Sequence, residues 1–401
     1  MFKNFFKKDE LRLLWPFYFD CLFVSIFFLY PAFFVIYARD IGLSLFQIGL
    51  LTSSMSLAAV LFEIPTGAIA DVFGRKFSVI LGLFLSGLVI ISILFFKDFK
   101  ILLLLFFIWG AIGTLMSGAG DAWVVDLLKH EKRKNLIQEY YSKRHSFFSI
   151  AFLIGGIVGA LLVKEFGVSI IWPITGGSML ITSFVFLFAK EHFRKKKQKI
   201  SKHVKQLFSH SKKSIKYSYN HQGLFLIMLG VIVFTLVTSL TGDITWYPLL
   251  QNLGLKEYWF GYLFSATFAI GIFCPYFIKP LIKISGGYIK YLLIVFSVQF
   301  LLLFLMGFVD ILVPVLLIYI LFMTTYDFFH PANITLFQRF VPSPMRATIG
   351  SFRNMLMSLV AIISFPLVGF IADKIGPQNT IFIGAFVLIP LIIIYSKIKE
   401  N

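Results

Sequence analysis

The stretch from Leu45 to Phe96 decides the fold, and it reads LFQIGLLTSSMSLAAVLFEIPTGAIADVFGRKFSVILGLFLSGLVIISILFF. Two apolar runs, at about 46–70 and 77–96, flank a short turn that ends on Arg75 and Lys76. A bilayer core about 30 Å thick needs roughly 20 apolar residues per helix. Each run is therefore long enough to cross a membrane, and the pair predicts a helical hairpin with a basic turn.

Runs of the same kind recur along the whole chain. The composition agrees with a lipid solvent, because 58% of the residues are hydrophobic and only 14% are charged, against about 45–50% and 25% in soluble domains. We predict an all-α membrane protein with twelve transmembrane helices in two pseudo-symmetric six-helix bundles, 1–189 and 223–401, joined by a basic loop at 190–222. The predicted spans are about 13–37, 46–70, 77–96, 101–128, 144–163, 171–189, 223–250, 259–281, 290–309, 312–338, 347–371 and 379–396.

Lysine and arginine set the predicted orientation, because cytoplasmic loops carry an excess of both. With the N-terminus inside, 31 of the 37 basic residues fall on the inner side. The six outer ones are Arg39, Lys97, Lys100, Lys164, Lys256 and Lys374. This split predicts a multi-pass protein of the cytoplasmic membrane with both termini inside. The net charge of +18 is then mostly a topology signal, and we expect no nucleic-acid partner.

The central loop has apolar residues at helical spacing among its lysines: Ile200, Val204, Leu207 and Phe208. This pattern predicts an amphipathic helix that lies on the anionic inner leaflet. The N-terminal stretch lacks the pattern of a cleavable signal peptide. Cys21 and Cys274 lie far apart inside apolar runs, so we expect no disulfide framework, no metal site and no cofactor.

The turn of the opening stretch carries the motif GAIADVFGRK at 67–76. It resembles the signature loop of the major facilitator superfamily, which has a glycine, an aspartate four residues later, a glycine three later and two basic residues. The preceding EIPTG at 63–67 is similar to a bacterial branch of that superfamily. The resemblance implies the major facilitator fold and a secondary transporter of a small-molecule solute, not an enzyme; we expect a monomer.

The resemblance also implies an inner gate, in which Asp71 docks on the start of span eleven and Arg75 pairs with an acid at the inner end of span four. Asp126 lies at that end. Arg353 and Arg144, near the starts of spans eleven and five, either hold acids at this gate or extend to the membrane surface. The predicted gate residues are Asp71, Gly74, Arg75, Lys76, Asp126 and Arg353. The alternative is a tight turn with a positive-inside signal and no gating role.

Acids within the spans are the next candidates, because a charge at the centre of a membrane helix costs about 3 kcal/mol. Asp121 in the fourth span lies at helical spacing from Gly110, Thr114 and Ser117, which predicts a polar stripe lining a cavity. Asp126 is five residues further on, about 140° round the helix. We therefore expect Asp126 to face elsewhere, as a gate residue does.

Other spans carry ionisable residues too. Asp327 and His330 in span ten share a face with Thr324, and Asp243 continues a polar stripe in span seven. Asp20 stands alone among phenylalanines in span one, where desolvation disfavours the charged form and makes it a candidate proton carrier. The alternative for each is a structural bond between helices. The predicted solute or proton pathway is Asp20, Asp121, Asp327, His330 and Asp243.

The two halves repeat weakly, since GALLVKEFG (159–167) and GFIADKIG (369–376) lie about 210 residues apart. Halves related in this way hold their solute between them near the midplane and expose it to one side at a time. The sequence has no nucleotide-binding loop, so we expect protons to drive transport, with efflux of a drug or metabolite as one direction. Span five has GALL at 159–162 where superfamily antiporters often have Gly-Pro and paired glycines. An uncoupled facilitator and a transporter-fold receptor or lipid translocator remain alternatives.

The orientation can be tested by labelling. In a variant without Cys21 and Cys274, a single cysteine at Lys97 or Lys256 should react with a membrane-impermeant maleimide from outside. A cysteine within 190–222 should react only when the inner side is accessible, because the basic split places that loop inside. Labelling of both from the same side contradicts the twelve-span prediction.

Overall fold

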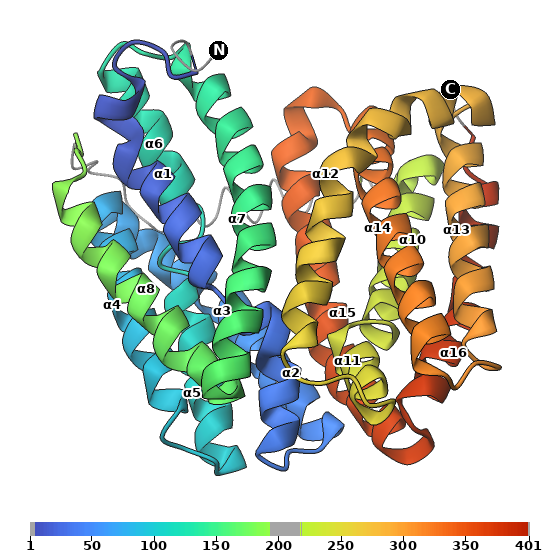
Figure 1. Cartoon of the computed structure of the whole chain (residues 1–401). Coiled ribbons are helices and arrows are strands. Elements are labelled where there is room, and N and C mark those ends of the chain that lie inside the picture. Colours follow the sequence, from blue (N-terminus) through green and yellow to red (C-terminus); the bar gives the residue numbers. More distant parts are fainter. Residues whose placement is uncertain (1–4, 193–216, 218, 400–401) are drawn as a thin grey trace. The chain divides into compact units, whose positions relative to one another are not determined.

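The computed structural model describes residues 5–192, 217 and 219–399, and within these residues every regular element is a helix (Figure 1). In this part of the chain eleven spans are long and apolar enough to cross a membrane, and Phe99–Gly113 is a shorter apolar helix. The all-helical membrane fold is therefore confirmed, and each predicted span coincides with helix. The amphipathic helix predicted around Ile200 lies outside the described residues.

The helices alternate along the chain with short turns. Their bounds are α1 Glu10–Phe27, α2 Tyr30–Asp40, α3 Leu45–Phe73, α4 Arg75–Ile93, α5 Phe99–Gly113, α6 Ala119–His130, α7 Leu136–Phe166, η2 Val168–Ile170, α8 Ile171–Val185, η3 Phe186–Phe188, α10 Gln222–Leu240, α11 Asp243–Asn252, α12 Trp259–Ser285, α13 Tyr288–Leu305, α14 Leu312–Phe340, η4 Ser343–Met345, α15 Arg346–Ile375 and α16 Pro377–Ser396.

Three predicted spans contain an interruption of the helix, although Glu10–Asp40 and Gln222–Asn252 are each still one apolar span. Span one breaks between α1 and α2, span four between α5 and α6, and span seven between α10 and α11. Gly118 ends the second interruption with φ of 67°, a left-handed conformation that glycine adopts without strain. Gly242 is extended before α11. The interruptions change which side chains share a face, because a stripe read at helical spacing does not continue across a break.

The chain divides into two compact units that do not coincide with its two halves. The first unit holds Met1–Tyr37, Ser54–Lys197 and Glu257–Ala269, and the second holds Ala38–Ser53, Gln198–Lys256 and Ile270–Asn401. The end of α2 and the start of α3 thus belong with helices from the second half of the sequence. Similarly, the start of α12 belongs with helices from the first half.

In the first unit, α1 packs on α7 and α4 packs on α8. Small residues allow these close approaches: a side chain placed on Gly155 would lie 2.6 Å from the Ile26 carbonyl oxygen. One placed on Gly156 would lie 2.5 Å from the carbonyl oxygen of Gly261 in α12. Gly159 meets the ring of Phe33 in the same way. The Gly-x-x-x-Gly spacing at 155–159 is therefore a close-packing surface.

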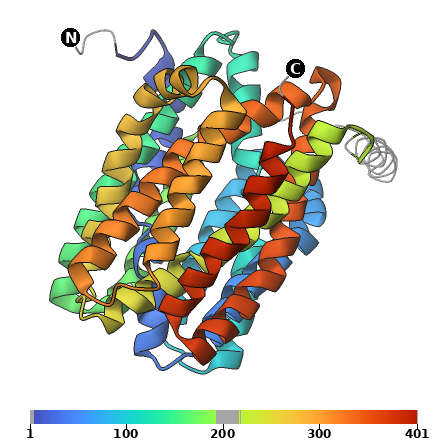
Figure 2. The same cartoon turned by 90° about the vertical axis from the view of Figure 1, so that its right-hand side faces the viewer.

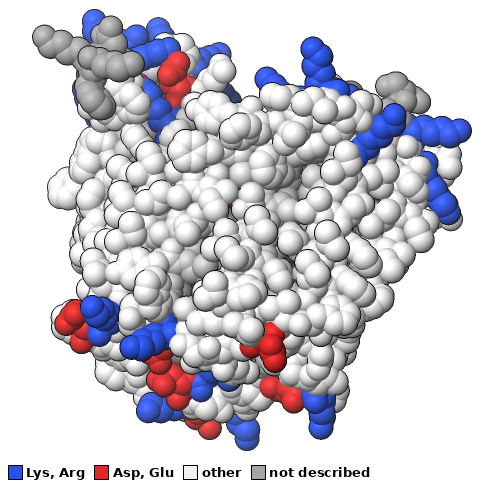
Figure 3. Space-filling view, turned by 45° about the vertical axis from the view of Figure 1, so that its right-hand side comes forward, with Lys and Arg blue, Asp and Glu red and all other residues white. Residues whose placement is uncertain are grey.

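In the second unit, α10 packs on α15 and α16, and α13 packs on α14 and α16 (Figure 2). Hydroxyls add short links within this apolar packing. The Ser239 hydroxyl of α10 lies 2.7 Å from that of Ser364 in α15. On the face drawn in Figure 3, charged side chains gather at the two ends and leave a broad band between them with almost no charge. Such a band suits a lipid environment.

Close packing of α3 on α5 gives a stability test. A side chain on Gly110 would lie 2.2 Å from the Met55 carbonyl oxygen, whereas Gly113, one turn on, has open space. We expect Gly110→Ala to destabilise the protein by about 1–3 kcal/mol, since the backbone must move, and Gly113→Ala to leave it unchanged. The measurement is the thermal unfolding midpoint of purified protein in detergent. Equal midpoints for the two variants contradict the packing described.

Candidate functional site

The turn between α3 and α4 places its basic residues against α6. Gly74 ends α3 with φ of 101°, and α4 begins at the next residue. The Arg75 guanidinium lies 2.6 Å from the Asp126 carboxylate and also donates to the Ala122 carbonyl oxygen. Arg75 therefore holds α6 to the start of α4. This is the pairing expected for Arg75; the gating role remains a proposal.

Lys76 serves a different partner from Arg75. Its ammonium donates to the carbonyl oxygens of Leu187 and Ala189, at 2.7 and 2.8 Å, and its backbone N–H donates to Glu191. These carbonyls end η3, where a cation is favoured by the exposed C=O groups. Lys76 thus ties the end of the sixth span to the start of the third.

Asp71 is exposed, and within the described residues its carboxylate has no hydrogen bond or ion pair. A matching aspartate stands in α15, where GFIADKIG (369–376) repeats the GAIADVFG of 67–74 at five of eight positions. Asp373 of that second motif accepts the backbone N–H groups of Leu45 and Phe46, each at 2.9 Å. One copy of the motif is thus docked on a helix start and the other is free.

The docked helix start is the N-terminus of α3. Its first amides need acceptors, because a helix leaves four N–H groups unpaired there. Ser44 and Gln47 form a capping box, in which each side chain accepts the backbone N–H of the other. Asp373 satisfies two more amides and places its charge at the positive end of the helix dipole. Gly369 makes room, since a side chain there would lie 2.1 Å from the Leu45 carbonyl oxygen.

Arg39 adds a second link in the same unit. At the end of α2, its guanidinium donates to the Pro248 carbonyl oxygen, the Gln251 side chain and the Asn252 side chain, at 3.2, 2.8 and 3.0 Å. All three acceptors belong to α11. Sequence reasoning counted Arg39 only as an outer basic residue and missed this contact.

Asp121 is not on the polar stripe that the sequence predicts. Since the helix is interrupted before Gly118, Asp121 lies in the first turn of α6, apart from Thr114 in the break. Its carboxylate pairs with the Arg144 guanidinium of α7. Asp20 of α1 is half-buried and within electrostatic range of Arg144, so it is not isolated, although no hydrogen bond or ion pair reaches it among the described residues. The structure thus gathers three residues that the sequence treated separately.

The acids of the second unit are separated from one another. Asp327 of α14 is half-buried, and a side chain on Gly271 of α12 would lie 3.0 Å from its carboxylate. Asp243 does not continue a stripe from α10; it is the first residue of α11, where an acid is favoured by the helix dipole. Neither has a basic partner among the described residues.

His330 of α14 and Arg353 of α15 lie within electrostatic range of each other. His330 is exposed and stacks on Tyr326, with ring centroids 5.9 Å apart. Arg353 is half-buried, and its guanidinium carbon lies 5.4 Å from the centre of the Phe337 ring. Its Nε is buried without a hydrogen-bond partner in the described part of the chain. Arg353 therefore forms no gate pair with an acid here.

A buried ion pair near the start of the chain was missed by sequence reasoning. Lys143 lies 2.6 and 2.7 Å from the two carboxylate oxygens of Glu10, which is fully buried. Tyr18 donates a further hydrogen bond of 2.6 Å to Glu10. Glu10 and Lys143 are 133 residues apart in sequence, so no local sequence pattern predicts the pair. It fixes α1 to α7, and removing one partner alone leaves a buried charge.

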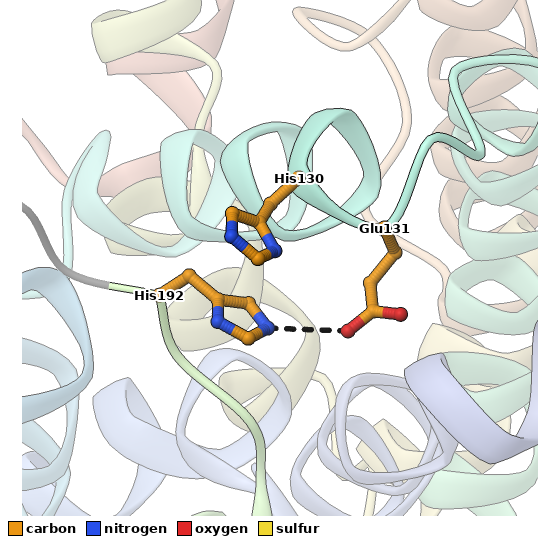
Figure 4. A group of neighbouring side chains, drawn as sticks. All are labelled: His130, Glu131 and His192. Atoms are coloured by element: carbon orange, nitrogen blue, oxygen red, sulfur yellow. Dashed lines mark hydrogen bonds and ion pairs between the residues drawn. The ribbon is translucent and has the colours of Figure 1, made fainter.

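A group of metal-ligand type lies at the end of α6, where His130, Glu131 and His192 have ligand atoms within 4.8 Å of one another (Figure 4). His192 is hydrogen-bonded to Glu131 at 3.1 Å. The two imidazole rings stack 3.6 Å apart at an interplanar angle of only 14°. Their in-plane lone pairs therefore run side by side and do not converge at the roughly 2.0 Å that zinc requires. We interpret the group as a link between α6 and the segment after α8.

The apolar helices define a multi-pass membrane protein. The model of the Major Facilitator Superfamily matches residues 20–364, and the chain belongs to that family. Its members are transporters, which are not enzymes, and they carry small-molecule solutes.

A relative in Bacillus subtilis (strain 168), the uncharacterized MFS-type transporter YxaM, is 24% identical over 365 residues, 88% of each chain. Among solved structures, a bacterial homologue of the iron transporter ferroportin, in an inward-facing state, gives a TM-score of 0.75 at 15% identity, covering 98% of this chain and 99% of that one. The nucleoside transporter NupG gives 0.69 at 15% identity, covering 96% and 99%. These structural likenesses show the fold alone.

Proposed function

We propose that the protein is a secondary active transporter, which moves a small solute across the cytoplasmic membrane by alternating access and is driven by protons. Both termini and the central loop lie in the cytoplasm in this proposal, following the basic split. The observation that carries it is the repeated motif, with Asp373 docked and Asp71 free.

The two copies of the motif end helices that leave the membrane on opposite faces, since α3 is the second span and α15 the eleventh. Asp373 joins the end of α15 to the start of α3. Asp71 stands at the other end of α3, where the superfamily gate docks on the start of span eleven. In one state the Asp373 contact closes the outer face, and in the other the Asp71 contact closes the inner face. Two mutually exclusive contacts on the same helix pair are what alternating access requires.

Proton coupling is supported by the acids without partners. Asp121 already has Arg144, which compensates its charge. Asp20 and Asp327 are half-buried in membrane-spanning helices and have no ion-pair partner among the described residues. A carboxylate that is neutral in one state and charged in the other avoids part of the cost of a permanent intramembrane charge. Asp20 and Asp327 are therefore the proposed proton carriers.

The gate is tested by transport in proteoliposomes, with a solute found by thermal-shift screening of the purified protein. We expect Asp71→Asn, Arg75→Ala, Asp126→Asn and Asp373→Asn to insert normally but to transport about tenfold more slowly, as loss of one charge-assisted contact implies. Asp310→Asn, an exposed acid between α13 and α14, is the matched control. Wild-type rates in all four variants reduce both motifs to turns.

Coupling is tested with the same vesicles under a proton gradient. Either Asp20→Asn or Asp327→Asn should abolish accumulation while preserving solute binding, and the pH dependence of transport should flatten, because asparagine cannot titrate. Asp121→Asn should keep the pH dependence, since Arg144 already compensates that acid. If all three variants accumulate solute with unchanged pH dependence, these acids are structural. If the wild type moves no protons with its solute, the protein is an uncoupled facilitator.

A further inference from the structure

The two halves of the chain carry matching arginines, of which only the first is paired with an acid. Arg353 of α15 lies 209 residues after Arg144 of α7, close to the offset of about 210 that relates the halves. His330 of α14 lies 209 residues after Asp121 of α6. The pair in the first half and the pair in the second are therefore equivalent positions, each separated by 23 residues.

In the first unit, Asp121 and Arg144 compensate each other's charge. The Asp121 carboxylate and the Arg144 guanidinium form an ion pair between α6 and α7. A planar guanidinium and a carboxylate match in shape as well as in charge. Arg144 thus has an anionic partner supplied by the protein.

In the second unit, the acid is missing. His330 occupies the position of Asp121, and a histidine supplies no negative charge. Arg353 has no hydrogen bond or ion pair within the described residues, and its Nε is buried. Of the 19 acidic residues only Glu400 lies outside the described part. A half-buried guanidinium without an anion is costly in a membrane helix.

The surroundings of Arg353 suit an organic anion. The buried ring of Phe337 lies 5.4 Å from the Arg353 guanidinium carbon, and Tyr326 and His330, which stack on each other on α14, lie within electrostatic range of Arg353. Asn333 and Tyr395 are buried and hydrogen-bonded to each other at 2.6 Å, and neither is hydrogen-bonded to the guanidinium. An apolar, aromatic wall with one convergent charge is the usual composition of a small-molecule site.

We propose that Arg353 binds the carboxylate or phosphate group of an anionic solute, which takes the place that the Asp121 carboxylate has beside Arg144. This inference rests on the proposed transport function and names its substrate class. The aromatic wall holds the rest of the solute, and the guanidinium forms paired hydrogen bonds to its oxygens. A phospholipid headgroup presents the same chemistry, so the test separates it from a free solute.

The first experiment compares solutes that differ in their anionic group. Purified full-length protein in a neutral detergent is screened by thermal shift with phenylacetate against phenylacetamide, and with ribose 5-phosphate against ribose. We expect at least one anion to raise the unfolding midpoint while its neutral counterpart does not. Equal shifts within each pair, or no shift from either anion, overturn the proposal.

Variants then locate the anion. Arg353→Gln should weaken binding of the stabilising anion by about tenfold or more, as loss of charged hydrogen bonds implies. Arg346→Gln, an exposed arginine at the start of the same helix, should retain it. Glu400→Gln should also leave binding unchanged. Retained affinity in Arg353→Gln contradicts the assignment.

A variant that restores the first unit's arrangement tests the same idea without relying on a loss. His330→Asp places a carboxylate beside Arg353, so we expect a higher unfolding midpoint without solute and weaker anion binding. Asparagine has the size of aspartate without its charge, so His330→Asn should shift both quantities much less. If His330→Asp and His330→Asn have the same unfolding midpoint and the same anion affinity, Arg353 is not an anion-binding residue.

The remaining arms separate the sources of the anion and the two proposals. If phosphatidylglycerol nanodiscs stabilise the protein through Arg353 and phosphatidylcholine nanodiscs do not, with no competition by free anions, the ligand is a lipid and the solute assignment fails. Arg353-dependent anion binding without transport in proteoliposomes refutes the transporter and keeps the site. Transport of neutral solutes at a rate that Arg353→Gln leaves unchanged refutes the anion site and keeps the transporter.

Discussion

The backbone of a membrane helix must satisfy its own hydrogen bonds, and the rest of this structure depends on that constraint. Three spans interrupt the helical hydrogen bonds, and at each interruption a side-chain hydroxyl forms a hydrogen bond with a backbone group. Thr175 donates to the Phe27 carbonyl and accepts from Leu29 N–H at the first break. Ser78 donates to the Leu115 carbonyl at the second, and Thr245 to the Leu240 carbonyl at the third. The breaks are therefore bonded features of the fold, able to present helix ends within the spans.

Those helix ends explain where the acids lie. Asp121 and Asp243 each occupy the first turn of a helix that begins after a break, where the unpaired amides favour a negative charge. Asp373 uses the same physics on a neighbouring helix, at the start of α3. An acid at a helix start already has part of its charge compensated, whereas Asp20 and Asp327 lie in the middle of helices and lack that help. The proton proposal follows from this difference in position.

The sequence predicts the spans and the Arg75–Asp126 neighbourhood well, because apolar length and a local motif determine both. The sequence does not predict the breaks at residues 28–29, 114–118 and 241–242, because a few small or polar residues do not end a long apolar span in a hydropathy pattern. The face predicted for Asp121 fails for the same reason. The Glu10–Lys143 pair joins distant segments, which no spacing reveals. The docked Asp373 had a usable signal, since its motif repeats that of Asp71 at five of eight positions.

Two features of the chain occur twice, and the two members of each differ. Both motif copies keep their aspartate, yet only Asp373 has a helix start to cap, so the two ends of α3 are in different states. Both halves keep an arginine at equivalent positions, yet only Arg144 has an acid. Asp71 is exposed at the end of α3, whereas Arg353 is half-buried in a membrane helix, where a charge without a partner is costly. In the proposed function a change of conformation supplies the partner of Asp71, and in the further inference an anionic solute supplies the partner of Arg353. Together the two proposals link solute binding to the change of state.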